Sequence, residues 1–378
     1  MSGPIVLTGG GTGGHIFPMQ AIAEALHDAG VDFADIRYVG SRRGQEHDLL
    51  GAGPIELVLL EGRGIRRSLA ARAWRDNCVA LWGLARAQVR ALGYVRAWRP
   101  RAVVSAGGYA AAAMASAAVL LRRPLVLVDL DAAPGLTHRV LSRFAAVRCV
   151  ALGAPGTPGS SNARVIVTGA PVRHEVAEID RSPDERARAR TRLSPPIDER
   201  RRVVVVMTGS LGATRVNLAV LELARLWGER NDVALVHVTG RRDFEMVMAQ
   251  RPEVTGLDYR VEAFADMATW WAVADVAICR AGATTVAELT VLSLPAILVP
   301  LPGAPGDHQS HNARALSTVG AAVVVPDSAC TGEALARHAD AMLTPAVLLE
   351  MSRASSLLAR PDAAASIART VLSTRVGS

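Results

Sequence analysis

A cluster of five glycines near the start of the chain constrains the fold most strongly. Residues 9–15 read Gly-Gly-Gly-Thr-Gly-Gly-His, between an apolar run at Ile5–Leu7 and an amphipathic pattern from Phe17 to Ala29. Glycines allow positive φ and close approach of the backbone to a ligand, and the N-terminus of a helix attracts anions. The sequence therefore predicts a strand, a phosphate-binding turn and a helix, which together open an α/β domain.

Short β-branched runs alternate with helical patterns along most of the 378 residues, which predicts parallel sheets covered by helices. The alternation is interrupted by a charged segment, 180–202, that contains three prolines, and it restarts with the apolar run Val203–Met207. The expected strands are Ile5–Leu7, Arg37–Val39, Ile55–Leu60, Ala102–Ser105, Leu125–Val128, Arg148–Ala151 and Val165–Thr168, then Val203–Met207, Ala234–Val238, Tyr259–Val261, Val276–Cys279, Ala296–Val299 and Ala322–Val325. We predict two doubly wound Rossmann-like domains, 1–170 and 203–345, joined by a linker region, 171–202.

Composition narrows the class of protein. Half of the residues are hydrophobic, and all 42 basic residues are Arg, which gives a net charge of +7 and favours anionic partners. The four cysteines are far apart, so we expect free thiols and no zinc site. The N-terminus lacks the basic start of a signal peptide, and the longest apolar run, 110–121, is too short to span a bilayer. We therefore expect a soluble protein.

Polar residues cluster where several expected strands end. Ser105-Ala106-Gly107-Gly108-Tyr109 follows one strand, and Thr208-Gly209-Ser210-Leu211-Gly212-Ala213 follows another. The segments 280–288 and 307–313 contain Thr284, Thr285, Glu288, His308, Gln309 and Asn312. Ligands bind at the carboxyl ends of parallel strands, and a carboxylate such as Glu288 can accept both hydroxyls of a ribose. The alternative is a solvated surface Glu288.

The first turn also matches a dinucleotide pattern at Gly9, Gly11 and Gly14. An NAD site needs an acidic residue at the end of the next strand, and here that strand is followed by Ser41-Arg42-Arg43. An arginine there can hold a 2′-phosphate, so an NADP-dependent oxidoreductase is the alternative from another class of enzyme.

Six motifs together resemble the MurG-like family of GT-B glycosyltransferases. They lie at residues 10–15, 106–109, 168–173, 209–213, 280–288 and 307–313, in the family's order. The resemblance implies two domains facing a central cleft, with C-terminal helices of 346–378 packing back on the first domain. It also implies inverting transfer of N-acetylglucosamine from UDP-N-acetylglucosamine to a polyprenyl-diphosphate acceptor, which converts lipid I to lipid II in peptidoglycan biosynthesis. A different UDP-sugar or acceptor, in another prenyl-phosphate glycolipid or natural-product pathway, is the alternative within the family.

The resemblance assigns roles to residues as well. It places Gly10, Gly11, Gly107, Gly108 and Tyr109 at the acceptor diphosphate, and it makes His15 the general base. The donor UDP-sugar would contact Thr12, Gly13, Gly14, Arg173, Ser210, Phe264, Ala265, Ala283, Thr284, Thr285, Val286, Ala287, Glu288 and Gln309. Within this set, Phe264 and Ala265 would lie beside the uracil, Glu288 at the ribose and Gln309 at the sugar. No cofactor and no metal are implied.

One motif departs from the family, which carries His-Glu-x-Asn where this chain has Val128-Asp129-Leu130-Asp131. A carboxylate at 131 cannot donate a hydrogen bond at neutral pH, whereas asparagine can. We retain Asp131 beside His15 as a second candidate catalytic residue. The spacing of Asp129 and Asp131 is also found in metal-dependent transferases, although the resemblance argues against a metal.

Arginines and tryptophans interleave over residues 65–101, where Trp74, Trp82 and Trp98 stand among several Arg. This pattern suits the surface of an anionic membrane, and it equally suits a helix with a core-facing side and a solvated Arg side. The resemblance implies a peripheral protein on the cytoplasmic face of the cell membrane. No motif for nucleic-acid recognition is present.

Overall fold

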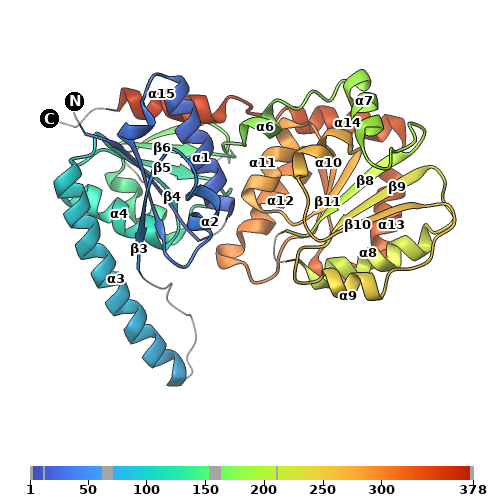
Figure 1. The fold of residues 1–378 in the computed structure, drawn as a ribbon, viewed down its shortest axis with the longest axis horizontal. Helices are drawn as coiled ribbons and strands as arrows, with labels where there is room; N and C mark the ends of the chain where they lie inside the picture. The colour runs from blue at the N-terminus through green and yellow to red at the C-terminus, as the bar shows by residue number, and fades with distance from the viewer. Residues whose placement is uncertain (1–2, 12, 62–70, 153–162, 210–211, 375–378) are drawn as a thin grey trace. The chain divides into compact units, whose positions relative to one another are not determined.

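The computed structural model describes residues 3–11, 13–61, 71–152, 163–209 and 212–374, without the side chains of 71–81, 109 and 305. The chain divides into two compact units (Figure 1). Unit 1 comprises 1–173 and 361–378, and unit 2 comprises 174–360. Each unit is built on one parallel sheet with helices packed on it.

The sheet of unit 1 has seven strands in the order β3-β2-β1-β4-β5-β6-β7. Their bounds are β1 (Ile5–Gly9), β2 (Ile36–Ser41), β3 (Glu56–Leu60), β4 (Ala102–Gly107), β5 (Leu125–Asp129), β6 (Val147–Val150) and β7 (Arg164–Val167). The central strands are buried along their whole length, as expected for a sheet covered on both faces. The strand order reverses between β1 and β4, so the loops after these two strands leave the sheet side by side.

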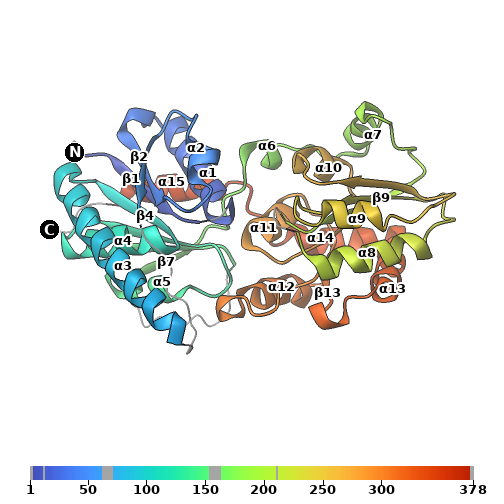
Figure 2. The same cartoon turned by 60° about the horizontal axis from the view of Figure 1, so that its bottom comes forward.

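Helices cover both faces of this sheet (Figures 1 and 2). On one face α3 (Ala71–Trp98) packs against α4 (Tyr109–Leu120), whose alanines join Val6, Val103 and Leu127 in a buried core. On the other face α1 (Gly13–Asp28) packs against α15 (Ala363–Ser373). Two short helices, α2 (Glu46–Leu50) and α5 (Leu136–Leu141), follow the turns after β2 and β5, and two 3-10 turns lie at Phe33–Asp35 and Ser142–Phe144.

Unit 2 has a six-stranded parallel sheet in the order β10-β9-β8-β11-β12-β13. Its strands are β8 (Arg202–Met207), β9 (Val233–Val238), β10 (Asp258–Glu262), β11 (Val276–Cys279), β12 (Ala296–Leu298) and β13 (Ala322–Val324). Its helices are α6 (His174–Ala177), α7 (Pro183–Arg192), α8 (Thr214–Leu226), α9 (Phe244–Ala249), α10 (Met267–Val273), α11 (Ala283–Val291), α12 (His308–Thr318), α13 (Gly332–Met342) and α14 (Pro345–Ser356), with 3-10 turns at Pro305–Asp307 and Asp327–Ala329. Here the order reverses between β8 and β11, so the loops after these strands are neighbours.

A buried carboxylate fixes the start of unit 2. Asp275, which precedes β11, accepts hydrogen bonds from Arg186, Arg190 and the backbone N–H of Val203. Arg181 donates to the carbonyls of Trp271 and Ala274. The charged segment predicted as a linker region therefore contains a helix, α7, that is bonded to unit 2.

The expected strands all form, with ends that shift by one or two residues. The C-terminal region differs from the expectation: α14, which falls within 346–378, belongs to unit 2 and packs on α11, whereas α15 packs on α1 in unit 1. The residues that return to unit 1 thus begin at Pro361 and not at 346. Cys149, Cys279 and Cys330 are buried free thiols.

Candidate active site

Three side chains that follow or lie on β2 hold the first glycine turn. The Tyr38 hydroxyl donates to the carbonyl of Gly9 (3.1 Å), and the backbone N–H of Gly11 donates to Glu46 Oε1 (3.1 Å). The N–H of Gly13 donates to Gln45 Oε1 (3.3 Å). Glu46 is fully buried, and its Oε1 also accepts the N–H of Ser41 (2.7 Å).

These contacts modify the expectation for the turn. The sequence predicts that the backbone N–H groups of this turn bind a phosphate. In the structure, the N–H groups of Gly11 and Gly13 already donate to side chains. The carboxylate of Glu46 takes the position that a bound anion would occupy beside the Gly11 N–H. The turn is therefore shaped by its own chain, and a bound diphosphate would use other donors or displace these.

The second glycine turn lies directly against the first, as the order β1-β4 requires. Gly107 and Gly108 have φ of 94° and 92°, which favour glycine. A Cβ on Gly108 would lie 3.0 Å from the carbonyl oxygen of Gly10, so the two backbones approach too closely for a side chain. The structure thus brings together Gly10, Gly11, Gly107 and Gly108, the residues predicted to face the acceptor diphosphate.

Beneath the second turn lies a buried polar network that the sequence analysis missed. His138 Nδ1 donates to Asp129 Oδ1 (2.7 Å), and Arg148 donates to Asp129 Oδ2 from Nη2 (2.7 Å) and Nε (3.1 Å). On the other side of the ring, His138 Nε2 shares a hydrogen bond with the Ser105 hydroxyl (3.0 Å). Ser105 in turn accepts the N–H of Gly107 (3.4 Å). The network thereby links Arg148 to the backbone of the turn.

The electrostatics of this network favour an ionised Asp129. Burial alone would raise the pKa of Asp129, but hydrogen bonds and charge from His138 and Arg148 outweigh it and hold the pKa below its usual range. All of the carboxylate's neighbours here are donors. Its oxygens are directed to His138 and Arg148, which does not fit a shared metal site with Asp131, and the described residues contain no cluster of metal-ligating side chains.

The three positions at which the chain departs from the family motif differ in exposure. Val128 is 1% exposed and Asp129 is 4% exposed, so neither presents its side chain at the surface. Asp131 lies two residues beyond β5 and is partly exposed. Of the three altered positions, Asp131 is therefore the most exposed.

His15 lies in the first turn of α1 and is partly exposed. Gly14 beside it is exposed, and Thr12 lies outside the described residues. Arg173, the last residue of the first part of unit 1, places its guanidinium over the ring of Phe17 at 5.2 Å. Unit 1 thus has both His15 and the Arg173 guanidinium near the first turns of α1.

In unit 2 the glycine turn after β8 packs against the turn after β9. Gly209 and Gly212 have φ of 84° and 81°, and a Cβ on Gly240 would lie 2.3 Å from the Gly212 N. Asp243 supports the turn, because its Oδ2 accepts from Thr214 and Asn217, both at 3.0 Å. Ser210, predicted to contact the donor diphosphate, lies outside the described residues.

The neighbouring turn after β11 carries the second group of predicted donor contacts. Ala283, Thr284 and Thr285 are partly exposed in the first turn of α11, whereas Val286 and Ala287 are buried. Two residues of α12 fix the adjacent loops: Asn312 Nδ2 donates to the carbonyl of Ala281 (3.1 Å), and Gln309 Oε1 accepts the N–H of Leu301 (2.9 Å). The Oε1 atom of Gln309 is therefore used within the protein, which leaves the Nε2 donor as the part suited to a sugar.

Glu288 is 5% exposed, so the solvated surface glutamate considered as an alternative is wrong. Its Oε2 accepts the indole N–H of Trp271 at 3.0 Å. Burial raises the pKa of the nearby Cys279 thiol to about 12, and the charge of Glu288 adds to the effect.

Phe264 is 59% exposed at the end of the segment after β10, and the guanidinium of Arg241 lies 4.8 Å above its ring. Ala265 beside it is partly exposed. An exposed aromatic ring beside the strand ends of β9 and β10 is a surface on which a planar base can stack. Arg241 is a neighbour of this ring that the sequence analysis did not identify.

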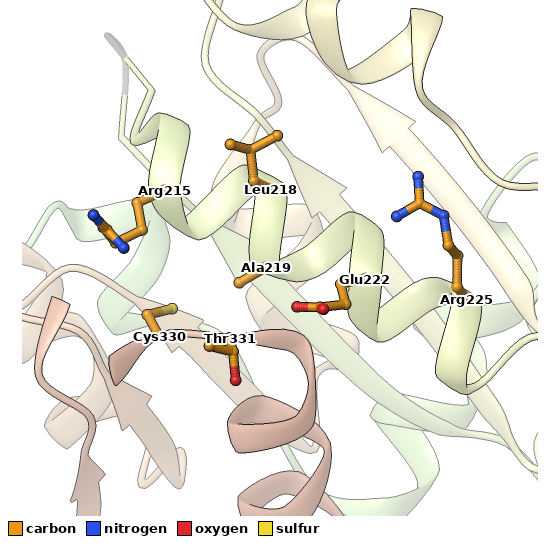
Figure 3. A pocket seen from close by; sticks show the side chains of 7 residues that line it. All are labelled: Arg215, Leu218, Ala219, Glu222, Arg225, Cys330 and Thr331. Atoms are coloured by element: carbon orange, nitrogen blue, oxygen red, sulfur yellow. The ribbon is translucent and has the colours of Figure 1, made fainter. Parts of the chain in front are cut away.

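A separate pocket of unit 2 is lined by α8 and the start of α13 (Figure 3). Its side chains are Arg215, Leu218, Ala219, Glu222, Arg225, Cys330 and Thr331. None of these belongs to the predicted site, and Glu222 uses Oε2 to accept the N–H of Gly332 (2.6 Å).

Each unit thus has two loops paired at the reversal of its strand order, and this pair of parallel-sheet domains matches the GT-B glycosyltransferase structure of MurG. Comparison with known proteins specifies the family. The profile of the glycosyltransferase family 28 N-terminal domain matches residues 5–148, and that of its C-terminal domain matches residues 203–367. The chain belongs to glycosyltransferase family 28.

Similar proteins carry a specific name. A protein of Alkalilimnicola ehrlichii is 40% identical over 98% of this chain and 99% of its own length, and one of Desulforudis audaxviator is 35% identical over 96% of each chain. Both are named UDP-N-acetylglucosamine–N-acetylmuramyl-(pentapeptide) pyrophosphoryl-undecaprenol N-acetylglucosamine transferase. The crystal structure of Acinetobacter baumannii MurG has a TM-score of 0.76 and 28% identity, over 98% of this chain and 100% of that one. These findings remove the oxidoreductase alternative.

Proposed function

We propose that the protein transfers N-acetylglucosamine from UDP-N-acetylglucosamine to a muramyl pentapeptide carried on undecaprenyl diphosphate, with inversion at the anomeric carbon. The observation that carries this proposal is the 40% identity, over nearly the full length of both chains, to a relative named for that transfer. The paired glycine turns of both units are consistent with two ligands that each contain a diphosphate.

The donor binds mainly to unit 2. The uracil stacks near Phe264 and Ala265, the ribose hydroxyls are accepted by Glu288, and the sugar contacts Gln309. The diphosphate lies at the turns that open α8 and α11, whose N-termini favour negative charge. Ser210 and Arg173 supply further donors to it. This arrangement neutralises the charge that develops on UDP as it leaves, which is the chief requirement of the transfer.

The acceptor binds to unit 1, with its diphosphate at the two glycine turns and at Tyr109. His15 removes the proton from the acceptor hydroxyl while that oxygen attacks the anomeric carbon and the bond to UDP breaks. Histidine suits this role because its unperturbed pKa lies near neutral pH. Asp131 is the second candidate at this site, through a contact with the sugar or the acceptor. The proposed mechanism requires no metal, because the donors named above carry the diphosphate charge.

A panel of UDP-sugars with a short-chain lipid I analogue tests this function. We expect transfer from UDP-N-acetylglucosamine and little from UDP-glucose or UDP-N-acetylgalactosamine. A preference for another UDP-sugar, or UDP binding without transfer to this acceptor, would instead support a different substrate within the family. Asp131 favours a different sugar or acceptor, because it is the most exposed of the three positions that depart from the family motif.

We further propose that unit 1 binds to the surface of an anionic membrane, on the cytoplasmic face. Within the described part of the chain, no helix has the length and apolarity to cross a bilayer. On α3, Trp82 and Val89 are 71% and 69% exposed and lie two helical turns apart, with Arg86 between them. Trp98, which the sequence grouped with this surface, instead stacks on Tyr94 and lies under Arg37.

A second exposed apolar group lies along α5 and the 3-10 turn after it, where Leu136, Val140 and Phe144 are 64%, 47% and 55% exposed. The guanidinium of Arg143 lies 5.1 Å from the Phe144 ring. Aromatic and aliphatic side chains interleaved with arginine suit an anionic interface.

Cosedimentation with phosphatidylglycerol vesicles tests the membrane proposal. We expect Trp82→Ala/Val89→Ala to reduce binding and Leu357→Ala, at an equally exposed site of unit 2, to leave it unchanged. Equal binding of all three proteins, or equal binding to neutral vesicles, would contradict the proposal.

A further inference from the structure

The ribose carboxylate of unit 2 has a fixed partner. Glu288 on α11 and Trp271 on α10 are 5% and 0% exposed, and Trp271 Nε1 donates to Glu288 Oε2 at 3.0 Å. The direction of this bond is certain, because an indole N–H can only donate and an ionised carboxylate can only accept.

The bond also suits the chemistry that Glu288 would perform. A ribose presents two vicinal hydroxyls that donate, so the acceptor must be ionised and held in one rotamer. Burial works against ionisation, whereas an N–H donor favours the charged form. The two oxygens of a carboxylate can accept about four hydrogen bonds, so the bond from Trp271 is compatible with acceptance from a ribose.

We propose that Trp271 is a positioning residue for nucleotide recognition: it orients the Glu288 carboxylate toward the ribose hydroxyls of the donor. This inference rests on the proposed function, specifically on the ribose contact of Glu288. Trp271 does not touch the nucleotide in this proposal. It acts by fixing the carboxylate before the nucleotide binds, which reduces the conformational entropy that the Glu288 side chain loses on binding.

The chain supplies a matched control in the adjacent residue. Trp270 is 5% exposed on the same helix, and its Nε1 donates to Glu262 Oε2 at 3.3 Å. Trp270→Phe and Trp271→Phe each remove one indole and one bond to a glutamate. Only the second bond involves the carboxylate assigned to the ribose.

The experiment compares the affinities of UDP and 2′,3′-dideoxyuridine 5′-diphosphate by calorimetry. The wild-type protein should prefer UDP. Trp271→Phe should reduce this preference about ten-fold, which corresponds to the loss of a hydrogen bond to a charged group worth about 1.4 kcal/mol. Trp270→Phe should retain the preference. Trp271→Tyr, whose hydroxyl can donate, should retain part of it.

The ratio of two affinities is insensitive to a general loss of stability, because such a loss weakens both nucleotides alike. If Glu288→Gln lowers the preference and Trp271→Phe does not, the positioning role is overturned and the ribose contact stands. If Glu288→Gln leaves the preference unchanged, the ribose contact itself is wrong, and the inference falls with it. An equal loss in Trp270→Phe and Trp271→Phe would also overturn the inference.

Discussion

The buried carboxylate of Asp129 gives the sharpest quantitative prediction. It is 4% exposed and accepts three hydrogen bonds, two of them from Arg148, which is itself 5% exposed. Asp129→Asn would remove the charge and leave the guanidinium without its counter-ion in the interior. Removing one partner of a buried pair costs about 3–5 kcal/mol, so we expect unit 1 to lose about 3 kcal/mol, the lower figure because asparagine retains one acceptor.

The assay must report on unit 1 alone, because the two units need not unfold together. Hydrogen exchange of peptides from β4 and β5, measured over a urea series, gives the free energy of unfolding of this sheet. Arg148→Met and the double variant complete a cycle in which the double variant should lose less than the sum of the single variants. Asp131→Asn, at a partly exposed position, should stay within about 0.5 kcal/mol of the wild type.

The pH dependence follows from the lowered pKa of Asp129. A carboxyl group with a depressed pKa in the folded state contributes stability above its unfolded pKa of about 3.9, and this stability is lost as the pH falls through the folded pKa. The difference between the wild type and Asp129→Asn should therefore shrink as the pH falls below about 4. A loss under 1 kcal/mol at pH 7, or additive single losses, would refute the description of the network as a buried ion pair.

Three further predictions concern both units. His15→Ala should lower kcat about 10²–10⁴-fold with UDP affinity unchanged, as measured by turnover and calorimetry, and a weakened UDP affinity would contradict its role as a base. Glu46→Ala leaves the buried N–H of Ser41 and the partly buried N–H of Gly11 without this acceptor, so unit 1 should lose about 2–4 kcal/mol and the acceptor KM should rise, whereas Glu46→Gln should lose much less. Burial lowers the pKa of His237 to about 3, so the unfolded chain alone binds this proton below about pH 6.5. Unit 2 should then lose about 1.4 kcal/mol per pH unit as the pH falls from 6.5, and His237→Gln should abolish that part of the slope.

The fold was predictable because the strand signals are local. The expected strands are short runs rich in β-branched and other apolar residues, the central ones are buried on both faces, and the glycine turns mark where strands end. The destination of the last helices was less predictable. Both α14 and α15 are short, with one apolar side, and only the packing surfaces of α11 and α1 decide between them.

The glycine residues of the candidate site were also predictable, because positive φ and close backbone approach are properties of glycine itself. Gly108 against Gly10 is an example. The residues that support these turns were not predictable. Glu46 lies 35 positions from Gly11, and His138 lies 33 positions from Ser105, so no local pattern links the partners.

Burial was the property that sequence reasoning judged least well. Glu288 was as consistent with a surface position as with a site, and its burial and its bond to Trp271 exclude the surface position. Asp129 and Asp131 have the spacing of a metal pair, yet they differ in environment, because Asp129 is the last residue of β5 and Asp131 lies two residues beyond the strand. Asp129 enters the interior network, and Asp131 is left at the edge.

The stereochemistry of the product tests the central claim most directly. The protein should be incubated with UDP-N-acetylglucosamine and a short-chain lipid I analogue, and the anomeric coupling constant of the new glycosidic bond should be measured by NMR. We predict a disaccharide with a β-linked N-acetylglucosamine, formed by the wild-type protein and at least 10²-fold more slowly by His15→Ala. An α-linked product, or equal rates for the two proteins, would contradict a single inverting displacement with His15 as the base.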